Sequence, residues 1–221
     1  MHTAFDYAKY FMSKNLDNNP NTFDGNMKLQ KLLVFAYLIS LAKYGHPLFN
    51  DRIYAFTKGY VVENVRQRYQ NDYNSLKAES EKYVPDFNEE EMYIIKCTID
   101  IYGSLNAKEL SGLSHMFDFW NDAYEKGSTP SGYHSKNDSI ITDEKMMEEI
   151  SAIKKVIQAY EQNNDSEFGS VYQCINGVKF FYKPYEIAMT DDLIDYLYHF
   201  AEDAEDNAYS VYYDKDNLVV Y

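Results

Sequence analysis

The residue types that carry catalysis are present in this chain, but their spacing matches no catalytic motif. The sequence has no glycine-rich phosphate loop, no Gly-x-Ser-x-Gly elbow and no His-Glu-x-x-His pair. Of its two cysteines, Cys97 falls in an apolar helical stretch, where a thiol usually packs as a small hydrophobe, and Cys174 falls in an expected strand. We therefore expect no catalytic residues, no bound cofactor and no enzymatic activity.

The densest set of possible metal ligands lies near the end of the chain. Asp192, Asp195, His199, Glu202 and Asp206 are spaced by three, four, three and four residues, which places them in one row on a helix. Such a row could bind a metal ion, but a solvated acidic face is far more common, so we expect no metal site. Like charges at these spacings weaken a helix, which makes Asp192, Asp195 and Glu202 candidates for contact with a basic partner.

A second candidate site surrounds Trp120, the only tryptophan of the chain. The segment Leu110–Trp120 is expected to form a corner between two helices, with the indole as a large aromatic anchor. His115 lies in this corner. It could cap or pack against a helix, which is the commoner role, or it could supply a polar group to a binding pocket beside Trp120.

The charge of the chain favours some partners over others. Its 221 residues include 21 Lys+Arg and 35 Asp+Glu, so the net charge is −14. Residues 186–221 hold ten acids and one base, which puts −9 of this charge in the last 36 residues. Such a surface repels nucleic acid and membranes, so neither is an expected partner, and it attracts basic proteins. An acidic tail that only keeps the protein soluble is the simpler alternative.

Composition also bears on the compartment. The most apolar run, Leu32 to Ala42, is too short to span a membrane, and no segment has the order of a signal peptide. Two cysteines are too few for a disulfide framework. We expect a soluble cytoplasmic protein. Its 23 tyrosines suit both a core and a partner surface.

The elements that would position these residues are mostly helical. Periodicity and capping residues predict amphipathic or helical segments at Phe5–Lys14, Met27–Tyr44, Val61–Tyr73, 89–102, 107–110 and Asp143–Tyr160. Asn88 and Asn106, each followed by a glutamate three residues later, are the predicted caps of the segments 89–102 and 107–110. The segment Asp51–Lys58 is expected to be a short helix or turn. Met27–Tyr44 is apolar almost all round, so this helix is expected to be buried.

The chain changes character after residue 162. Val171–Ile175 and Val178–Tyr182 flank an Asn-Gly pair, which is the strongest short signal for a β-hairpin. A helix capped by Thr190 follows, and then two more strands, Tyr209–Tyr213 and Leu218–Tyr221. We therefore predict a mainly α fold, with a helical domain over residues 1–162 and an acidic ββαββ extension over residues 163–221. A unit this small is expected to pack on the helical domain or on a partner.

Three blocks of sequence, in order, resemble one family. They are residues 27–49, residues 53–62 and residues 110–120. Together they resemble the Panacea domain, the SocA-like antitoxin domain often found beside phage genes, over about residues 5–160. The chain departs from the family pattern at Phe56, where a tryptophan is usual. It departs again at Tyr60, which replaces the proline of a Gly-Pro-Val turn and so makes that turn less rigid.

The resemblance implies a compact, mostly helical antitoxin. Members neutralise diverse small toxins by direct binding, and one member acts as an adaptor that delivers its toxin to a protease. Tyr60, His115 and Trp120 are then candidate partner-binding residues of the shared domain. Core packing is the alternative role for all three. Two further alternatives stay open: a phage or defence accessory protein that binds another protein, and a hydrolase with a site near His115.

Overall fold

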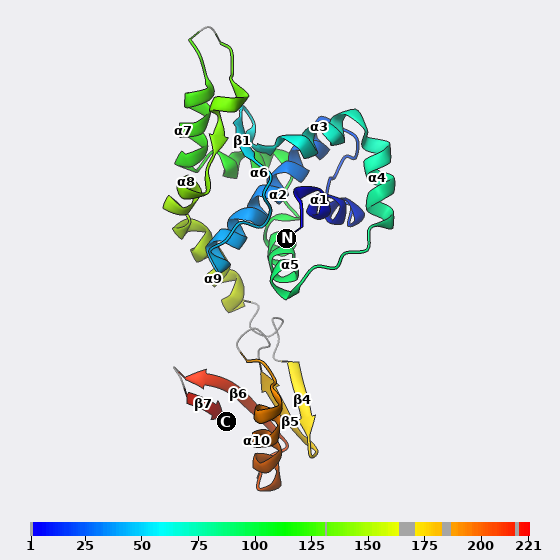
Figure 1. The fold of residues 1–221 in the computed structure, drawn as a ribbon, viewed down its shortest axis with the longest axis vertical. Coiled ribbons are helices and arrows are strands. Elements are labelled where there is room, and N and C mark those ends of the chain that lie inside the picture. The colour runs from blue at the N-terminus through cyan, green and yellow to red at the C-terminus, as the bar shows by residue number, and fades with distance from the viewer. Residues whose placement is uncertain (1, 131, 164–170, 183–186, 215–216) are drawn as a thin grey trace. The chain divides into compact units, whose positions relative to one another are not determined.

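The structure is a computed structural model that describes residues 2–130, 132–163, 171–182, 187–214 and 217–221. The chain divides into two compact units, Met1–Gln158 and Ala159–Tyr221. The first unit is mostly helical, and the second consists mainly of a sheet and one covering helix (Figure 1). The predicted fold class, a mainly helical protein with an α+β C-terminal extension, is confirmed.

The first unit is built from short helices around one long helix, with a small sheet. Its sheet has the order β2-β1-β3 and is antiparallel throughout. The helix α9 continues past the end of the unit. The elements are α1 (Ala4–Ser13), α2 (Phe23–Tyr44), β1 (Ile53–Phe56), β2 (Gly59–Val62), α3 (Glu63–Asn71), α4 (Tyr73–Lys82), α5 (Glu89–Tyr102), α6 (Ala107–Ser114), α7 (Asp118–Gly127), the 3-10 turn η1 (Lys136–Asp138), β3 (Ile140–Ile141), α8 (Asp143–Glu148) and α9 (Ser151–Asn163).

Helix α2 lies at the centre of this unit, with α1, α5, α6 and β2 packed against it (Figure 1). Its residues are buried on every side from Gly25 to Ala42, except for the half-buried Met27. The helix begins at Phe23, earlier than the predicted start, because Thr22 Oγ1 accepts a hydrogen bond from the Gly25 N–H at 3.1 Å.

No helix in the described part of the chain is long and apolar enough to cross a membrane.

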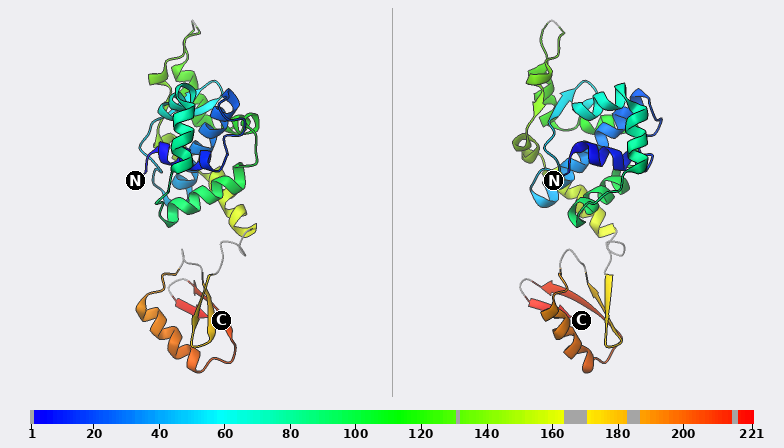
Figure 2. Two further views of the ribbon diagram at one scale, coloured as in Figure 1. Left: turned by 90° about the vertical axis from the view of Figure 1, so that its right-hand side faces the viewer. Right: turned by 45° about the vertical axis from the view of Figure 1, so that its right-hand side comes forward.

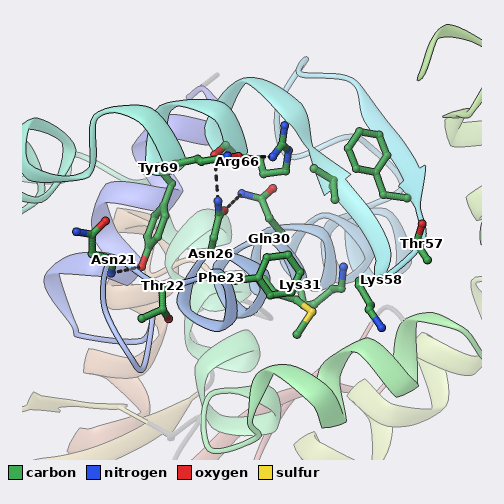
Figure 3. A pocket seen from close by; sticks show the side chains of 14 residues that line it. Asn21, Thr22, Phe23, Asn26, Gln30, Lys31, Thr57, Lys58, Arg66 and Tyr69 are labelled. Carbon is green, nitrogen blue, oxygen red and sulfur yellow. Dashed lines mark hydrogen bonds between the residues drawn. The ribbon is translucent and has the colours of Figure 1, made fainter. Parts of the chain in front are cut away.

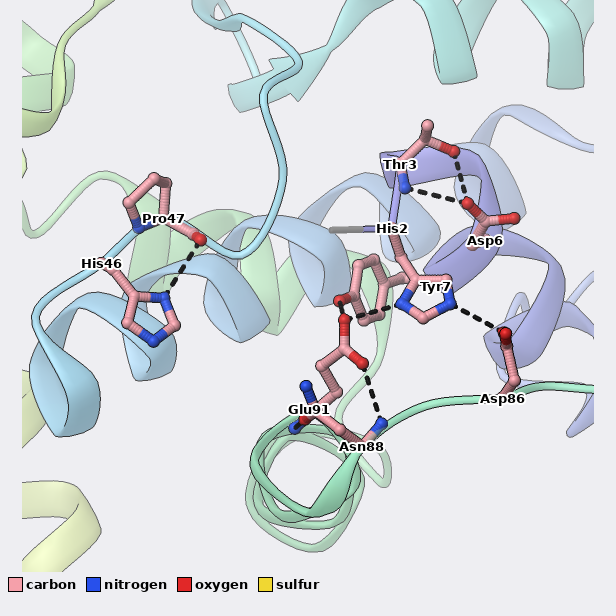
Figure 4. A network of polar contacts seen from close by, with 9 residues as sticks. All are labelled: His2, Thr3, Asp6, Tyr7, His46, Pro47, Asp86, Asn88 and Glu91. Atoms are coloured by element: carbon pink, nitrogen blue, oxygen red, sulfur yellow. Dashed lines mark hydrogen bonds and ion pairs between the residues drawn. The ribbon is translucent and has the colours of Figure 1, made fainter.

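One carboxylate both caps α5 and ties it to α1 (Figure 4). Glu91 Oε2 accepts from the Asn88 N–H at 2.9 Å, which completes the predicted capping arrangement. Its other oxygen, Oε1, accepts from the Tyr7 hydroxyl at 2.6 Å and contacts His2 Nδ1 at 2.7 Å. The second ring nitrogen of His2 reaches Asp86 Oδ1 at 2.8 Å. Burial alone would raise the pKa of Glu91, but the hydrogen bonds from Tyr7, His2 and Asn88 lower it on balance.

The segment Asp51–Lys58 is mainly a strand, so the prediction of a short helix or turn was wrong except at Thr57 and Lys58, which form the hairpin turn. It contains β1, which pairs with β2 from Ile53↔Val62 to Phe56↔Gly59. The residues of β1 alternate between buried and half-buried, as a strand at the edge of a core requires. The predicted amphipathic stretch Val61–Tyr73 accordingly starts as strand and becomes helical only at Glu63.

The predicted helix Asp143–Tyr160 is interrupted at Glu149, whose side chain caps another helix. Its carboxylate accepts from the backbone N–H groups of Asp118 at 2.8 Å and Phe119 at 2.6 Å. These donors belong to the first turn of α7, which would otherwise leave them without partners. The chain therefore breaks between α8 and α9. The apolar side chains spaced three and four residues apart along this segment are buried all the same: Met146, Ile150, Ile153, Ile157 and Tyr160.

The second unit is the predicted ββαββ arrangement. Its elements are β4 (Val171–Ile175), β5 (Val178–Tyr182), α10 (Asp191–Glu202), β6 (Ala208–Asp214) and β7 (Asn217–Val220). The sheet has the order β4-β5-β6-β7, and β5 and β6 are parallel because α10 connects them. Figure 2 shows α10 against one face of the sheet, where Val178, Phe180, Leu197 and Val211 form the core.

The turn and cap of this unit follow the sequence signals. Asn176 and Gly177 have φ values of 49° and 85°, so both central residues take the positive φ of a type I′ turn. Thr190 accepts from the Leu193 N–H at 3.3 Å, as predicted for the cap of α10. The segment that connects the last two predicted strands includes Lys215 and Asp216, which lie outside the described residues.

The His2 network predicts a pH-dependent contribution to stability. Desolvation lowers the pKa of His2, but the hydrogen bonds to Glu91 and Asp86 raise it on balance above 6.5. A raised folded-state pKa stabilises the protein below the unfolded pKa, and this gain is lost as pH rises through the folded pKa. His2→Ala should therefore lower the free energy of unfolding by about 1 kcal/mol at about pH 5.5 and by much less at about pH 9.

Denaturant unfolding at the two pH values measures this difference. The matched control is His46→Ala, because His46 contacts the exposed carboxylate of Glu90 at 3.2 Å in a half-exposed position. Such an exposed contact contributes little. An equal loss for His2→Ala at both pH values would contradict the ionic role of His2.

Gly59, which begins β2, predicts a steric constraint on the hairpin. Its φ is +96°, and a Cβ there would lie 2.7 Å from Ser114 Cβ and 2.9 Å from Lys31 Nζ. Gly59→Ala should cost about 3 kcal/mol of unfolding free energy, because strain and overlap add. Gly45→Ala is the control: its φ is +76° with nothing within 4 Å. It should cost about 1 kcal/mol, from backbone strain alone. Equal losses would show that the close packing around Gly59 is without consequence.

Candidate functional site

The corner that holds Trp120 is built around the β1–β2 hairpin. α6 ends at Ser114, His115 is its C-cap residue and α7 starts at Asp118, so the predicted corner between two helices is present. Trp120 is half-buried, and its indole Nε1 donates to the Phe56 carbonyl at 3.1 Å. The tryptophan therefore anchors α7 to the last residue of β1.

Four rings form a stacked column along α7. The ring of His115 lies 4.1 Å from that of Trp120, Trp120 lies 5.2 Å from Tyr124, and Tyr124 lies 4.8 Å from His134. The planes of neighbouring rings differ by 13° to 30°. The structure thus brings the two predicted corner residues into contact and adds two rings that the sequence analysis had not singled out.

Besides Trp120, three side chains from other parts of the unit make polar contacts with backbone carbonyls of the hairpin. His134 Nε2 lies 2.9 Å from the Ala55 carbonyl, Ser111 Oγ donates to the Lys58 carbonyl at 3.0 Å, and Lys31 Nζ donates to the Tyr60 carbonyl at 2.8 Å. A short hairpin is only marginally stable alone. These contacts fix its position relative to α2, α6 and α7.

His115 is exposed, and the charges that act on it are cationic. Partial desolvation lowers its pKa, Lys31 and Lys58 lower it further, and a hydrogen bond with the Thr57 backbone raises it. A hydrolytic histidine instead needs an acid or a nucleophile beside it. The thiol of Cys97 is buried in α5, as expected for a cysteine that packs as a small hydrophobe. Within the described part of the chain, the charged groups that act on His115 are thus two lysines and no acid.

Tyr60 lies in the core rather than on a surface or in a pocket. Its side chain is fully buried, edge-on to Phe35 at 5.7 Å and stacked with Phe119 at 6.1 Å between ring centroids. Its hydroxyl has no hydrogen-bond partner among the described residues. Its carbonyl accepts a hydrogen bond from the Lys31 ammonium at 2.8 Å.

The acidic residues of α10 are all exposed. Asp192, Asp195 and Glu202 face away from the core residues Leu193, Leu197 and Ala201. His199 Nδ1 lies 3.4 Å from Glu202 Oε2 in an exposed pair. Within the described residues, no group of three or more His, Cys, Asp or Glu side chains could hold a metal ion. Tyr196 and Tyr198 are also about half exposed on this helix.

The sequence analysis missed two buried lysines on α2. Lys28 and Lys31 are each 1% exposed, and the Lys28 ammonium donates to the Gly103 carbonyl at 2.7 Å. The available signal was their position in a helix that is apolar almost all round. A lysine in such a helix has no exposed face to occupy, so it must find an acceptor inside the protein.

The comparisons with known proteins support the resemblance seen in the sequence. The search of curated proteins and the search of solved structures each gave no match. A match to a protein family covers residues 29–121, which run from α2 into α7 and include the hairpin, His115 and Trp120. It supports an antitoxin-type role. The family is described as antitoxin SocA-like, Panacea domain, so residues 29–121 carry the similarity to SocA-like antitoxins that the three sequence blocks predicted.

Proposed function

We propose that this protein is an antitoxin-type binding protein that neutralises a small basic protein toxin by direct contact. The observation that carries this proposal is the match of residues 29–121 to the SocA-like antitoxin family. Neutralisation by contact requires a complementary surface and no catalytic group. This role is consistent with the surroundings of His115, because the charged groups that act on its ring are two lysines.

The exposed face of α10 is the proposed contact for the basic toxin. It presents Asp192, Asp195 and Glu202 to solvent, and Tyr196 and Tyr198 are 51% and 48% exposed beside them. Opposite charges speed association and fix orientation, and tyrosines are frequent among the residues that dominate binding energy. The residues that the sequence singled out on α10 are thus available to a partner.

The column around Trp120 is the proposed second contact, on the shared domain. His115 is exposed there, the neighbouring Met116 is 75% exposed, and Trp120 is half-buried. A rigid aromatic group with an exposed apolar neighbour suits an interface core, because little side-chain entropy is lost on binding. Delivery of the bound toxin to a protease is the finer role that the family resemblance suggests.

Co-expression with the neighbouring open reading frame tests the antitoxin role directly. We expect the neighbour to arrest growth alone, and this protein to restore growth and to co-purify with it. A neighbour that is harmless, and that forms no complex, would reject the antitoxin role in favour of an accessory protein with another target. Loss of the toxin from cells only when a protease is present would identify the adaptor role.

Charge reversal on α10 tests the proposed contact. The triple variant Asp192→Lys, Asp195→Lys and Glu202→Lys should weaken toxin binding by about 100-fold and reduce its salt dependence, because it replaces attraction with repulsion. Calorimetry at low and high salt measures both effects. The matched control reverses three exposed acids of the first unit, Glu81, Asp122 and Asp138, so that the net charge changes equally. Equal effects of the two triple variants would reject a specific role for α10.

A further inference from the structure

A cavity of about 630 Å³ opens between α2, α3 and the β1–β2 hairpin (Figure 3). Acids outnumber bases 35 to 21 in the chain. The residues that line this cavity nevertheless include the bases Lys31, Lys58 and Arg66 and no acid. Arg66 is paired with Glu63 at 2.6 Å, whereas the structure gives neither lysine an ion pair with a described carboxylate. The cavity is therefore cationic within an acidic protein.

Lys31 is the buried part of this charge. Its side chain is 1% exposed, and among the described residues its ammonium makes one hydrogen bond, to the Tyr60 carbonyl at 2.8 Å. The Tyr60 ring lies 5.4 Å from the same ammonium. A lysine ammonium has three donors, so this one keeps donors for a group in the cavity.

Lys31 differs from Lys28, the other buried lysine of α2, in the charges that act on its ammonium. Both are buried on α2, and burial lowers the pKa of each. For Lys28 this is partly offset by the negative charges of Asp17 and Glu109. For Lys31 burial acts alone and lowers the pKa to about 7. A buried cation without a counter-charge destabilises a fold, and such groups concentrate at functional sites.

We propose that this cavity is a binding site for a small organic anion, one that carries a carboxylate or phosphate group on an apolar body. The anionic group would accept hydrogen bonds from Lys31 and Lys58. In Figure 3 these two lysines lie at one end of the cavity, and Asn21 and Tyr69 lie at the other. The apolar body would lie between the ends.

The shape and lining of the cavity fit such a ligand. Its volume falls in the range of small-molecule sites, which are mostly apolar with a few convergent polar groups. Phe23, Met27, Phe56 and Val61 line it, and Phe23 is 69% exposed. The basic toxin proposed above would not complement a cationic cavity. This site is therefore independent of the toxin contact.

Calorimetry with four probes on the full chain tests the site. 1-Naphthoate and 1-naphthyl phosphate supply both an anion and an apolar body, 1-naphthol supplies the body alone, and inorganic phosphate supplies the anion alone. We expect one or both aromatic anions to bind, and the two single-feature probes to bind about tenfold more weakly or not at all. The stronger aromatic anion would identify the group that the cavity prefers. Absence of binding by both would overturn the site.

Two lysine variants locate the binding. Lys31→Met and Lys58→Met should each weaken binding of the aromatic anion by about tenfold, as loss of a charge-assisted hydrogen bond predicts. Lys28→Met is the matched control, because Lys28 is equally buried on the same helix but does not line the cavity. Unchanged affinity in both cavity variants would overturn the proposal.

Thermal unfolding separates a binding role from a structural one. Lys31→Met removes a buried cation that has no counter-charge, which is favourable, but it also leaves the Tyr60 carbonyl without this hydrogen bond, which is unfavourable. The two effects oppose each other, so the unfolding midpoint should change little. If this variant fails to fold, the exposed Lys58 still decides the matter, since Lys58→Met leaves the core intact.

A pH series adds a readout specific to Lys31. The charged or titratable groups that face it are Lys58 in the hairpin turn, Arg66 on α3, His115 after α6 and Tyr60 on β2. The pKa of His115 is lowered below 6.5 and that of Tyr60 is raised, so neither changes charge between about pH 7 and about pH 9. Binding of naphthoate should weaken across this interval as Lys31 loses its proton. In Lys31→Met this dependence should disappear, and its persistence there would overturn the role of Lys31.

The anion site and the proposed antitoxin role can be rejected independently of each other. The charge-reversed α10 variant should bind the aromatic anion normally, and Lys31→Met should bind the toxin normally. Loss of anion binding in the α10 variant would show that the probe binds elsewhere and would overturn the site. If the protein proves to have no toxin partner, the titration with the aromatic anion is still a valid test of the cavity.

Discussion

Helix α2 is buried along most of its length, and two of the side chains that it carries into the interior are lysines. A buried ammonium needs an acceptor, because the loss of its hydration is otherwise uncompensated. Lys28 meets this need at the Gly103 carbonyl, just after α5, and Lys31 meets it at the Tyr60 carbonyl on β2. The helix is thereby tied to two elements by directional contacts. Packing alone would leave their positions along α2 less defined.

The β1–β2 hairpin is where these constraints meet. Its carbonyl groups contact side chains of α2, α6, α7 and the segment before β3. Gly59 gives the turn its positive φ and leaves no room for a side chain against Ser114. This clamped hairpin has the Trp120 column on one of its edges and contributes Phe56, Thr57 and Lys58 to the cationic cavity. One small element therefore positions both of the surfaces that we propose for ligands on the helical unit.

The two units carry opposite electrostatic features. The first contains a cavity lined by three bases and no acid, and the second presents a row of exposed acids on α10. Such an arrangement suits two ligands of opposite charge that do not compete. The proposed anion site is compatible with a net charge of −14, since short-range contacts in a concave site outweigh the screened charge of distant residues.

Local signals in the sequence were sufficient wherever neighbours along the chain decide the structure. The caps at Asn88, Asn106 and Thr190 and the Asn-Gly turn were predicted correctly, because each depends on residues within one turn. The family resemblance was likewise predicted from short blocks and is matched over residues 29–121. The sequence also indicated that Trp120 and His115 belong to one corner.

The contacts between residues that are distant in the sequence were decided only by the tertiary structure. Glu149, just after α8, caps α7. The strand β1 forms within Asp51–Lys58 because β2 and β3 both pair with it. Tyr60 is buried against Phe35 and Phe119. The cationic cavity belongs here too, since its lysines are far apart in sequence. By itself the sequence determined most of the helices, the caps, the family resemblance and the acidic face of α10. The tertiary structure decided which polar groups were taken out of water together, because desolvation depends on neighbours in space rather than along the chain.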